Sequence, residues 1–231
     1  TTSGDVSAIR FGNVVLQEAN GQAPDQHITV AVQNAGAPPP PPPSVDCHNN
    51  VCNLMVDGLP ATGGSFNTLG CGTPACTFLW LNQISPPPTD YPITLNTVQT
   101  IFSATGTAVG DTFDVYIYQD NDNDPSNGAT FKGSVLGQTV ASPQNSLQTI
   151  TIPGGLALTG SGDILIAMVT RTPSPYPGSA DDAVADQQRS WIGGLGSTIA
   201  NPPNLTALAL EHPGDALAGF DHNWIIRAQG S

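Results

Sequence analysis

FDVYIY, residues 113–118, and DILIAMVT, residues 163–170, are the stretches that decide the fold. The first alternates with a period of two, which predicts a strand with one face toward a core and the other toward solvent. Its expected inward residues are Phe113, Val115 and Ile117, and its expected outward residues are Asp114, Tyr116 and Tyr118. The second is apolar on both faces, which is typical of a central strand.

Similar short stretches continue on either side of these two, separated by turn residues about every ten to fifteen positions. We therefore predict an all-β fold, an antiparallel β-sandwich, over residues 91–231. The strands we expect are 93–102, 112–118, 129–139, 147–152, 156–158, 163–170, 190–193 and 223–228. In the last of them, Trp224 and Ile226 are expected inward and Arg227 outward.

Four stretches of this region also carry a resemblance to a known kind of module. They are FDVYIYQDNDNDPSNGATF (113–131), GDILIAMVTR (162–171), RSWIGG (189–194) and NWIIRAQG (223–230). Together they resemble a jelly-roll-like β-sandwich module found in secreted bacterial proteins. The resemblance covers residues 91–231 and implies a non-catalytic, extracellular accessory module without a defined ligand.

The composition favours strands and excludes several classes of partner. Charged residues make up 10% of the 231 residues, whereas glycine and proline number 25 and 22. Strong helix formers such as Glu, Lys and Arg are scarce. The net charge is −13 with only five basic residues, so we expect neither nucleic-acid binding nor docking to an anionic membrane. Since no apolar run reaches about 18 residues, we expect no membrane insertion.

Six consecutive prolines, residues 38–43, divide the chain. They predict a stiff polyproline II linker of roughly 19 Å. Before it, residues 1–37 form an expected β arm with strands at 6–16 and 26–33. After it we expect a loop-rich, disulfide-bearing segment at 44–90, where Trp80 is predicted to be a core or interface residue, and then the sandwich at 91–231.

The arm is too small to be stable alone, because an isolated two-stranded ribbon is marginal in water. Its apolar positions must therefore pack either on its own body or on another copy of the chain, and the sequence leaves both options open. The residues expected to make this contact are Ile28, Val30, Val32, Ile9 and Phe11. Strand addition between copies would give open filaments unless the geometry closes.

Four cysteines occur as two pairs of identical spacing, Cys47/Cys52 and Cys71/Cys76. We read them as disulfides of an exported protein. Three connectivities are possible, of which local pairing is favoured because four intervening residues can close a small loop. A zinc site that includes His48 is the alternative. The chain starts at Thr1 rather than Met, which fits a mature extracellular or cell-surface protein whose signal peptide has been removed.

The acidic run DNDND, residues 120–124, is the candidate metal site. Carboxylates of Asp120, Asp122 and Asp124 could converge on Ca²⁺, which prefers oxygen ligands. The sequence does not follow the EF-hand pattern, since Pro125 and Phe131 stand where that loop needs Gly and Glu. A solvated turn is the alternative, because Asp and Asn both favour turns.

No catalytic motif that we could recognise is present, and we expect no enzymatic activity. The leading hypothesis is an extracellular structural protein that self-assembles into a filament or surface layer through strand addition by its arm. Its partners would be copies of itself. The alternative is a carbohydrate-binding or adhesive module that binds polysaccharide on an aromatic platform formed by Trp80, Trp191 and Tyr116.

Overall fold

The computed structural model describes residues 9–16, 26–33, 45–48, 51–58, 66–181, 187–216, 220 and 222–231. The chain divides into two compact units, residues 1–40 and 41–231, and each is described by itself. The proline run at 38–43 lies outside the described residues. None of the helical segments in the described part of the chain has the length and hydropathy that a membrane crossing requires.

The first unit contains a two-stranded antiparallel sheet of β1 (Ile9–Leu16) and β2 (Gln26–Gln33). The register places Ile28 opposite Val14 and Val30 opposite Gly12. Both strands were predicted, and β2 has the predicted bounds.

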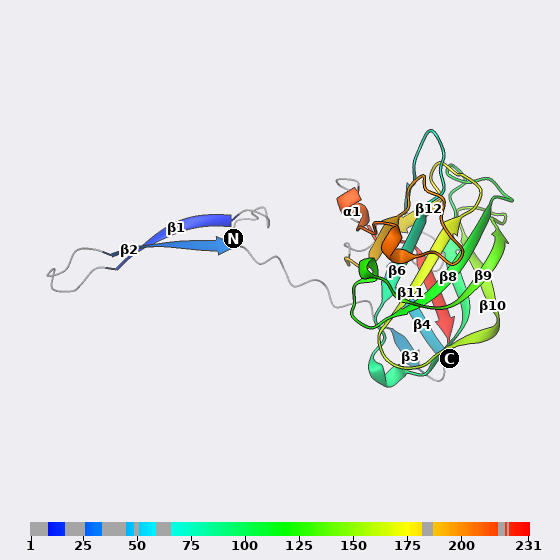
Figure 1. The fold of residues 1–231 in the computed structure, drawn as a ribbon, viewed down its shortest axis with the longest axis horizontal. Helices are drawn as coiled ribbons and strands as arrows, with labels where there is room; N and C mark the ends of the chain where they lie inside the picture. Colours follow the sequence, from blue (N-terminus) through cyan, green and yellow to red (C-terminus); the bar gives the residue numbers. More distant parts are fainter. Residues whose placement is uncertain are drawn as a thin grey trace. The chain divides into compact units, whose positions relative to one another are not determined.

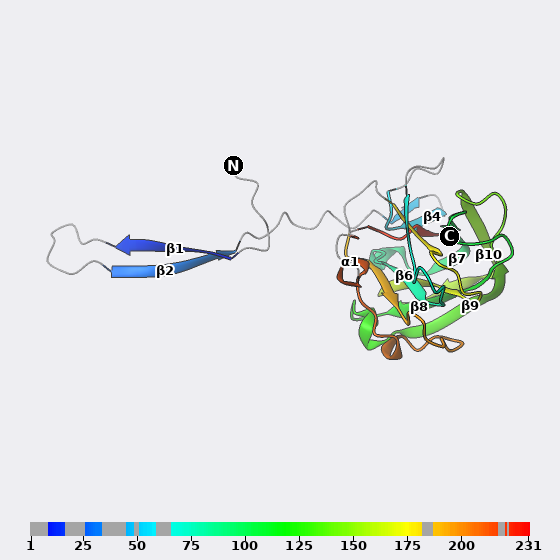
Figure 2. The ribbon, with the colours of Figure 1, turned by 90° about the horizontal axis from the view of Figure 1, so that it is seen from above.

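The second unit is built around two five-stranded antiparallel sheets, which Figures 1 and 2 show stacked face to face. The first sheet runs in the order β10 (Leu147–Leu158), β7 (Ile93–Ile101), β14 (Ile226–Gly230), β4 (Val51–Met55) and β3 (Asp46–His48). The second runs in the order β13 (Ser190–Gly193), β6 (Leu79–Ile84), β11 (Asp163–Thr170), β8 (Thr112–Asp120) and β9 (Thr130–Thr139). The predicted antiparallel β-sandwich is thus confirmed.

Smaller elements decorate the two sheets. A short two-stranded sheet pairs β5 (Phe66–Leu69) with β12 (Gly178–Asp181). The helical turns are η1 (Pro88–Asp90), η2 (Pro125–Asn127), η3 (Leu205–Ala207) and α1 (Pro213–Ala216). Among the residues that the structure describes, helix is therefore confined to single turns, as the scarcity of helix formers predicts.

The sandwich begins earlier in the chain than residue 91, where sequence analysis placed its start. Strands β3 and β4 extend the first sheet beside β14, and β6 lies between β13 and β11 in the second sheet. The segment 44–90 therefore contributes to both sheets rather than forming a separate lead-in.

Strand β10 covers two stretches, 147–152 and 156–158, that sequence analysis predicted as separate strands. Its register against β7 shifts between Thr151 and Leu156, where the PGG run interrupts the pairing. Gly155 has a φ of +71°, and a Cβ there would lie 2.8 Å from Thr94 Cγ2. Only glycine fits this close approach. The strand therefore continues through an irregularity at residues 153–155, where the sequence pattern predicts the end of one strand and the start of another.

A single apolar core lies between the two sheets and draws residues from both. A row of aromatic rings crosses this core. The ring centroid of Trp80 lies 5.1 Å from that of Phe78 and 6.4 Å from that of Phe102, and the centroids of Phe102 and Phe113 are 4.7 Å apart. The predicted inward set of β8 and the inward pair Trp224 and Ile226 all belong to this core. Trp80 is fully buried, so its prediction as a core residue is confirmed.

A second apolar layer corrects the prediction for the opposite face of β8. Tyr116 and Tyr118 point away from the main core, yet they are 0% and 2% exposed. Residues of the segment 199–210, including Leu205 and Leu208, pack over them and over Leu165 of β11. The expectation of solvent contact was wrong because this segment, which has no strand pattern of its own, covers the sheet.

Arg227 also differs from its prediction. Its Nε donates to both carboxylate oxygens of Asp57, at 3.1 and 3.0 Å, and its side chain is 9% exposed. The outward orientation expected from alternation brings Arg227 beside a buried carboxylate rather than into water. The pair therefore links the last strand to the segment that follows β4.

Replacing Asp57 with Asn should lower the free energy of unfolding by about 3 kcal/mol, because it leaves the buried Arg227 guanidinium without its counter-charge. Urea denaturation at neutral pH measures this loss. The exposed Asp215→Asn removes the same charge elsewhere and should leave the midpoint unchanged. A loss in Asp57→Asn no larger than in this control would show that the ion pair does not stabilise the sandwich.

Candidate functional site

The acidic loop follows β8 directly and is folded by its own side chains. Asp120 Oδ1 accepts the backbone N–H of Asp122 at 3.2 Å, and Asp122 Oδ1 accepts that of Asp124 at 3.2 Å. Asp124 Oδ1 accepts the backbone N–H of Ser126 at 3.0 Å and so caps η2. Each aspartate thus holds the backbone two residues ahead, which is the usual behaviour of Asp in tight turns.

The three aspartates do not form a three-carboxylate metal site. Within the described residues, no group of three or more His, Cys, Asp or Glu side chains is arranged to hold a metal ion. Asp120 and Asp122 line an open hollow of about 430 Å³ together with Asn127, whereas Asp124 is not among its lining residues.

Two buried carboxylates lie side by side at the base of the loop. Asp120 and Asp163 are direct cross-strand partners in β8 and β11, and both are 3% exposed. Asp163 accepts hydrogen bonds from Gln83 Nε2 at 2.5 Å and from Arg189 at 3.2 Å. Gln83 Nε2 also donates to the backbone carbonyl of Asn123 at 3.1 Å, so the same residues anchor the loop.

Burial perturbs the charges in this pair of strands. Burial raises the pKa of Asp120 to about 6, and the carboxylates of Asp122 and Asp163 raise it further against the hydrogen bond from the Asp122 backbone. The pKa of Asp122 is lowered, chiefly by the hydrogen bond from the Asn127 side chain at 2.8 Å. Asp122 is therefore charged at neutral pH, and Asp120 titrates just below neutrality.

The turn before β11 packs closely against the end of β8. Gly162 has a φ of +120°, and a Cβ there would overlap the carbonyl oxygen of Asp120. Tyr91 donates its hydroxyl to the Gly162 carbonyl at 2.6 Å, and burial raises the pKa of Tyr91 to about 12, so this donor keeps its proton. The end of β8 is thus clamped between its own loop and this turn.

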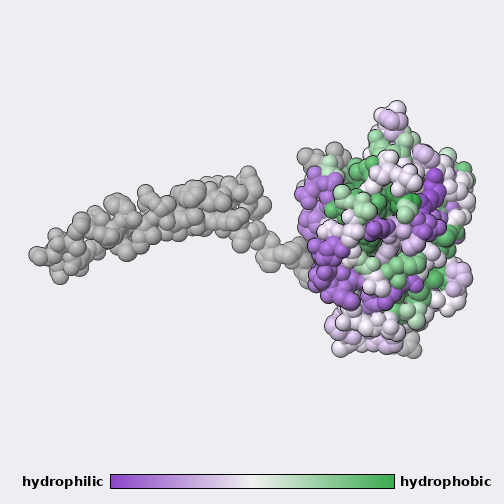
Figure 3. Space-filling model, in the orientation of Figure 1, coloured by the Kyte–Doolittle hydropathy of each residue, from purple (hydrophilic) through white to green (hydrophobic). Residues whose placement is uncertain are grey.

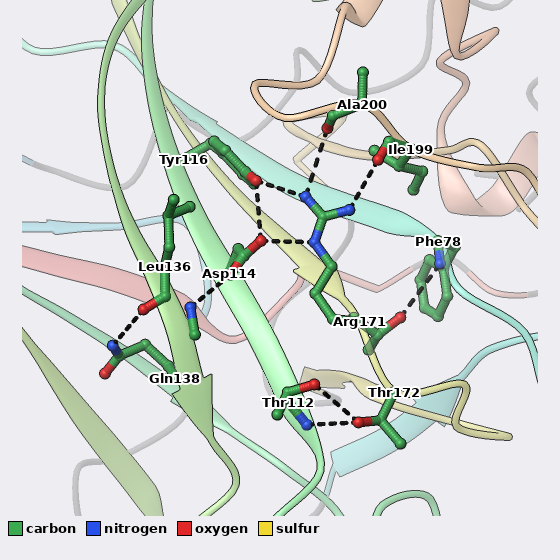
Figure 4. Close-up of polar contacts among 12 residues, drawn as sticks. Phe78, Thr112, Asp114, Tyr116, Leu136, Gln138, Arg171, Thr172, Ile199 and Ala200 are labelled. Atoms are coloured by element: carbon green, nitrogen blue, oxygen red, sulfur yellow. Dashed lines mark hydrogen bonds and ion pairs between the residues drawn. The ribbon is translucent and has the colours of Figure 1, made fainter.

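A second polar network fastens the covering segment to β8 (Figure 4). Arg171 Nε donates to Asp114 Oδ2 at 2.6 Å, and its terminal nitrogens donate to Tyr116 Oη at 2.5 Å and to the Ile199 carbonyl at 2.8 Å. Asp114 also accepts the backbone N–H of Gly137 at 2.7 Å. These contacts explain why Asp114, expected to face solvent, is 5% exposed. The network is structural, because every group in it is used by the protein.

The aromatic platform expected for carbohydrate binding is not formed. Trp80 and Tyr116 are both fully buried, and they belong to different apolar layers. Trp191 is half-buried, stacks on His212 with ring centroids 4.0 Å apart, and donates its indole N–H to Gln83 Oε1 at 3.1 Å. The three rings therefore offer no common stacking surface.

The cysteines pair locally, as predicted. Cys47 is bonded to Cys52 and Cys71 to Cys76, and no free cysteine remains among the described residues. The Cys47–Cys52 bond closes the β3–β4 hairpin, because these two residues are also register partners. The zinc alternative for these residues is excluded because their thiols are used in disulfides.

The register of the arm divides its five predicted contact residues into two sets. Ile28, Val30 and Val32 fall on one set of alternate positions, opposite Val14, Gly12 and Arg10. Ile9 and Phe11 fall on the other set, opposite Gln33 and Ala31. The predicted contact residues are therefore divided between the two sets of alternate register positions.

Sequence analysis missed Gln83, Asp163 and Arg189 as partners of the acidic loop. The available signal was the polar residue at the end of each apolar strand: Gln83 near the end of β6 and Asp163 at the start of β11. Adjacent strand ends meet at one edge of a sheet, but the pairing order β13-β6-β11-β8 is not visible in the sequence.

The outer face of the first sheet carries two rows of mainly polar residues. One row across four strands consists of Asn53, Gln229, Thr97 and Thr151, and the next consists of Met55, Arg227, Gln99 and Thr149. A hollow of about 170 Å³ is lined by residues of both rows.

On the face of this unit that Figure 3 shows, hydrophilic and hydrophobic residues are interspersed in small patches.

Comparisons with known proteins give only distant likenesses. No known protein-family model matches the chain. No curated protein matches it either. One similar solved structure is the clostridial cysteine protease Cwp84 after propeptide cleavage, with a TM-score of 0.47 and 13% identity over 73% of this chain. Another holds the cysteine protease and lectin-like domains of Cwp84, a surface layer associated protein of Clostridium difficile, with a TM-score of 0.43 and 16% identity over 67% of this chain. The chain spans 38% and 32% of those two chains.

Replacing Asp120 with Asn should stabilise the metal-free protein at pH 7.5 by about 0.5–1 kcal/mol, because it removes a like charge directly opposite Asp163. A carboxyl whose pKa is higher in the folded than in the unfolded state destabilises the fold above that pKa. The difference should therefore shrink as the pH falls from about 6 to about 4, where wild-type Asp120 gains its proton. Urea denaturation in a chelator at both pH values measures it, and a variant less stable than wild type at pH 7.5 would contradict the charge assignment.

Proposed function

We propose that this chain is a non-catalytic extracellular structural protein whose copies join into a filament or surface layer, with β1 and β2 of one copy adding to a sheet edge of the next. The observation that carries the proposal is the difference in size and completeness between the two units. Unit 41–231 has two five-stranded sheets closed over a core of their own, whereas unit 1–40 has a two-stranded antiparallel ribbon. A ribbon of this size needs a further surface to be stable.

The edge strands of the sandwich differ in how well they could accept another strand. Strand β3 has three residues and is tied by the Cys47–Cys52 disulfide. Strand β13 has four, and Ile192 is bridged by Glu211. Strand β10 is interrupted by its PGG irregularity, a feature that discourages edge pairing.

Strand β9 is the edge that we propose as the acceptor. It has ten residues, more than the eight of β2, and in the described residues it pairs with β8 on one side. Its register against β8 also shifts twice, between Phe113 and Val115 and between Ile117 and Tyr118, so its length and exposed apolar residues, rather than a regular ladder, favour it. It also carries two large apolar side chains in contact with solvent, Phe131 at 40% and Leu136 at 46% exposure. A strand added here would extend the backbone hydrogen bonds and cover part of this apolar surface.

Two local disulfides support the extracellular assignment, because such bonds persist in oxidising compartments. The low charge content and the abundance of threonine, asparagine and glutamine suit close packing between neighbouring subunits.

Deleting residues 1–37 should convert an assembling protein into a folded monomer, because the sandwich keeps its own core. Sedimentation velocity and circular dichroism at matched concentrations measure size and folding. In the full chain, Leu136→Glu should also abolish assembly by placing a charge on the acceptor edge. Leu195→Glu is the matched control, since Leu195 is 44% exposed in the turn after β13, at the opposite edge of the sheet from β9. Polymers that persist in the deletion variant would rule out the arm as the link.

The polar face of the first sheet supports a second candidate function, binding of a neutral polysaccharide. Gln229 Nε2 donates to Asn53 Oδ1 at 3.2 Å, and Gln99 Nε2 donates to Thr149 Oγ1 at 3.1 Å. Rows of amides and hydroxyls at strand spacing present donors and acceptors that match sugar hydroxyls. A polar sheet face is also common without any ligand, so this candidate ranks second.

Affinity electrophoresis in gels that contain soluble neutral polysaccharides should show retardation of the protein if this face binds sugar. The double variant Asn53→Ala/Gln229→Ala should then migrate freely, because it removes the amides of one row. Gln138→Ala, on β9 of the other sheet, should remain retarded. Equal migration of all three proteins in every gel would dismiss this candidate.

A further inference from the structure

All but one of the aspartates that are buried in the described part of the chain have an arginine as partner. They are Asp57, Asp114, Asp120 and Asp163. Three of them pair with an arginine: Asp57 with Arg227, Asp114 with Arg171 and Asp163 with Arg189. Asp120 has no basic partner among the described residues, although it lies directly across from Asp163.

The side chain of Asp120 is also incompletely bonded. Its Oδ1 accepts the backbone N–H of Asp122, but its Oδ2 is buried without any hydrogen-bond partner in the described structure. A buried carboxylate with an unsatisfied oxygen and no counter-charge is costly. Native structures usually satisfy such a group with a bound ion, a water molecule or a proton.

The surroundings of Asp120 favour a cation as its partner. Asp120 and Asp122 both line the hollow of about 430 Å³, together with Gln119, Asn121, Asn127 and residues 128–130. These residues carry carboxylate, side-chain amide, hydroxyl and backbone carbonyl oxygens, the kind of ligand that hard cations prefer. Arginine is absent from the lining, so no protein cation competes for the space.

We propose that this hollow binds a calcium ion, with Asp120 and Asp122 as its carboxylate ligands and amide, backbone carbonyl and water oxygens completing the shell. Calcium fits better than magnesium, because an open, irregular set of oxygens suits its larger and more flexible coordination shell. Asp124 takes no part, since it is not among the residues that line the hollow and its carboxylate caps η2 through Ser126. The site would tie the end of β8 to the start of β9, the two strands that the loop connects.

Calcium titration of the chelator-treated full chain, by isothermal calorimetry and thermal unfolding, tests this site. We expect one saturable site with a Kd of about 0.1–1 mM, as in extracellular calcium modules, and a rise in Tm of about 3–6 °C at 10 mM calcium. Asp120→Asn and Asp122→Asn should each weaken binding by about tenfold or more. Magnesium at the same concentration should give a smaller shift.

Asp215→Asn serves as the charge-matched control and should bind calcium as wild type does, since Asp215 is exposed on α1. The Asp120→Asn protein should fold, because an amide oxygen can still accept the Asp122 N–H. Two results would overturn the proposal: no saturable binding by the wild type, or binding that both aspartate variants retain. Neither depends on whether the chain assembles.

Discussion

The closure of two five-stranded sheets over one apolar core is the constraint on which the rest of this structure depends. The aromatic rings of Phe78, Trp80, Phe102 and Phe113 span that core, and strands from both ends of unit 41–231 help to close it. Strand β14, the last in the chain, lies between β4 and β7. A body completed in this way has a core of its own, which supports the proposal that the β1–β2 ribbon adds to another copy.

Scarce charge is the second constraint. With five basic residues in the chain, each arginine of the sandwich is committed to one buried aspartate, and each pair fastens a different part. Arg171 holds the covering segment 199–210, Arg189 supports the base of the acidic loop, and Arg227 links the last strand to Asp57. Asp120 falls outside this scheme, and the proposed calcium ion would supply its missing counter-charge.

Much of the fold could be predicted from the sequence because alternation and turn residues mark strands directly. Residues 26–33, 163–170 and 190–193 were predicted with their observed bounds. Burial of the outward face could not be predicted, because the segment that covers Tyr116 and Tyr118 has no periodic pattern of its own. The same limit applied to the candidate site: the sequence marked Asp120, Asp122 and Asp124, but the position of Asp120 opposite Asp163 arises from a strand pairing between distant segments.

The two proposals meet at the strands β8 and β9. An ion bound between Asp120 and Asp122 would order the connection from which β9 starts, and β9 is the edge proposed to accept the arm of another copy. The acidic loop would then contribute to assembly by holding the acceptor strand in place, while the arm supplies the contact between subunits.

The central claim is that the arm of one copy lies along β9 of another, and the lysine content of the chain allows a direct test. Lys132 is the one lysine in the sequence, and it lies on β9. Carbodiimide coupling in a mixture of ¹⁴N- and ¹⁵N-labelled protein would join this lysine to nearby carboxylates, and mass spectrometry would read the isotope of each peptide. The account predicts mixed-isotope cross-links between Lys132 and the arm carboxylates of Glu18 or Asp25. Cross-links from Lys132 to the arm that are found only within one isotope would contradict it.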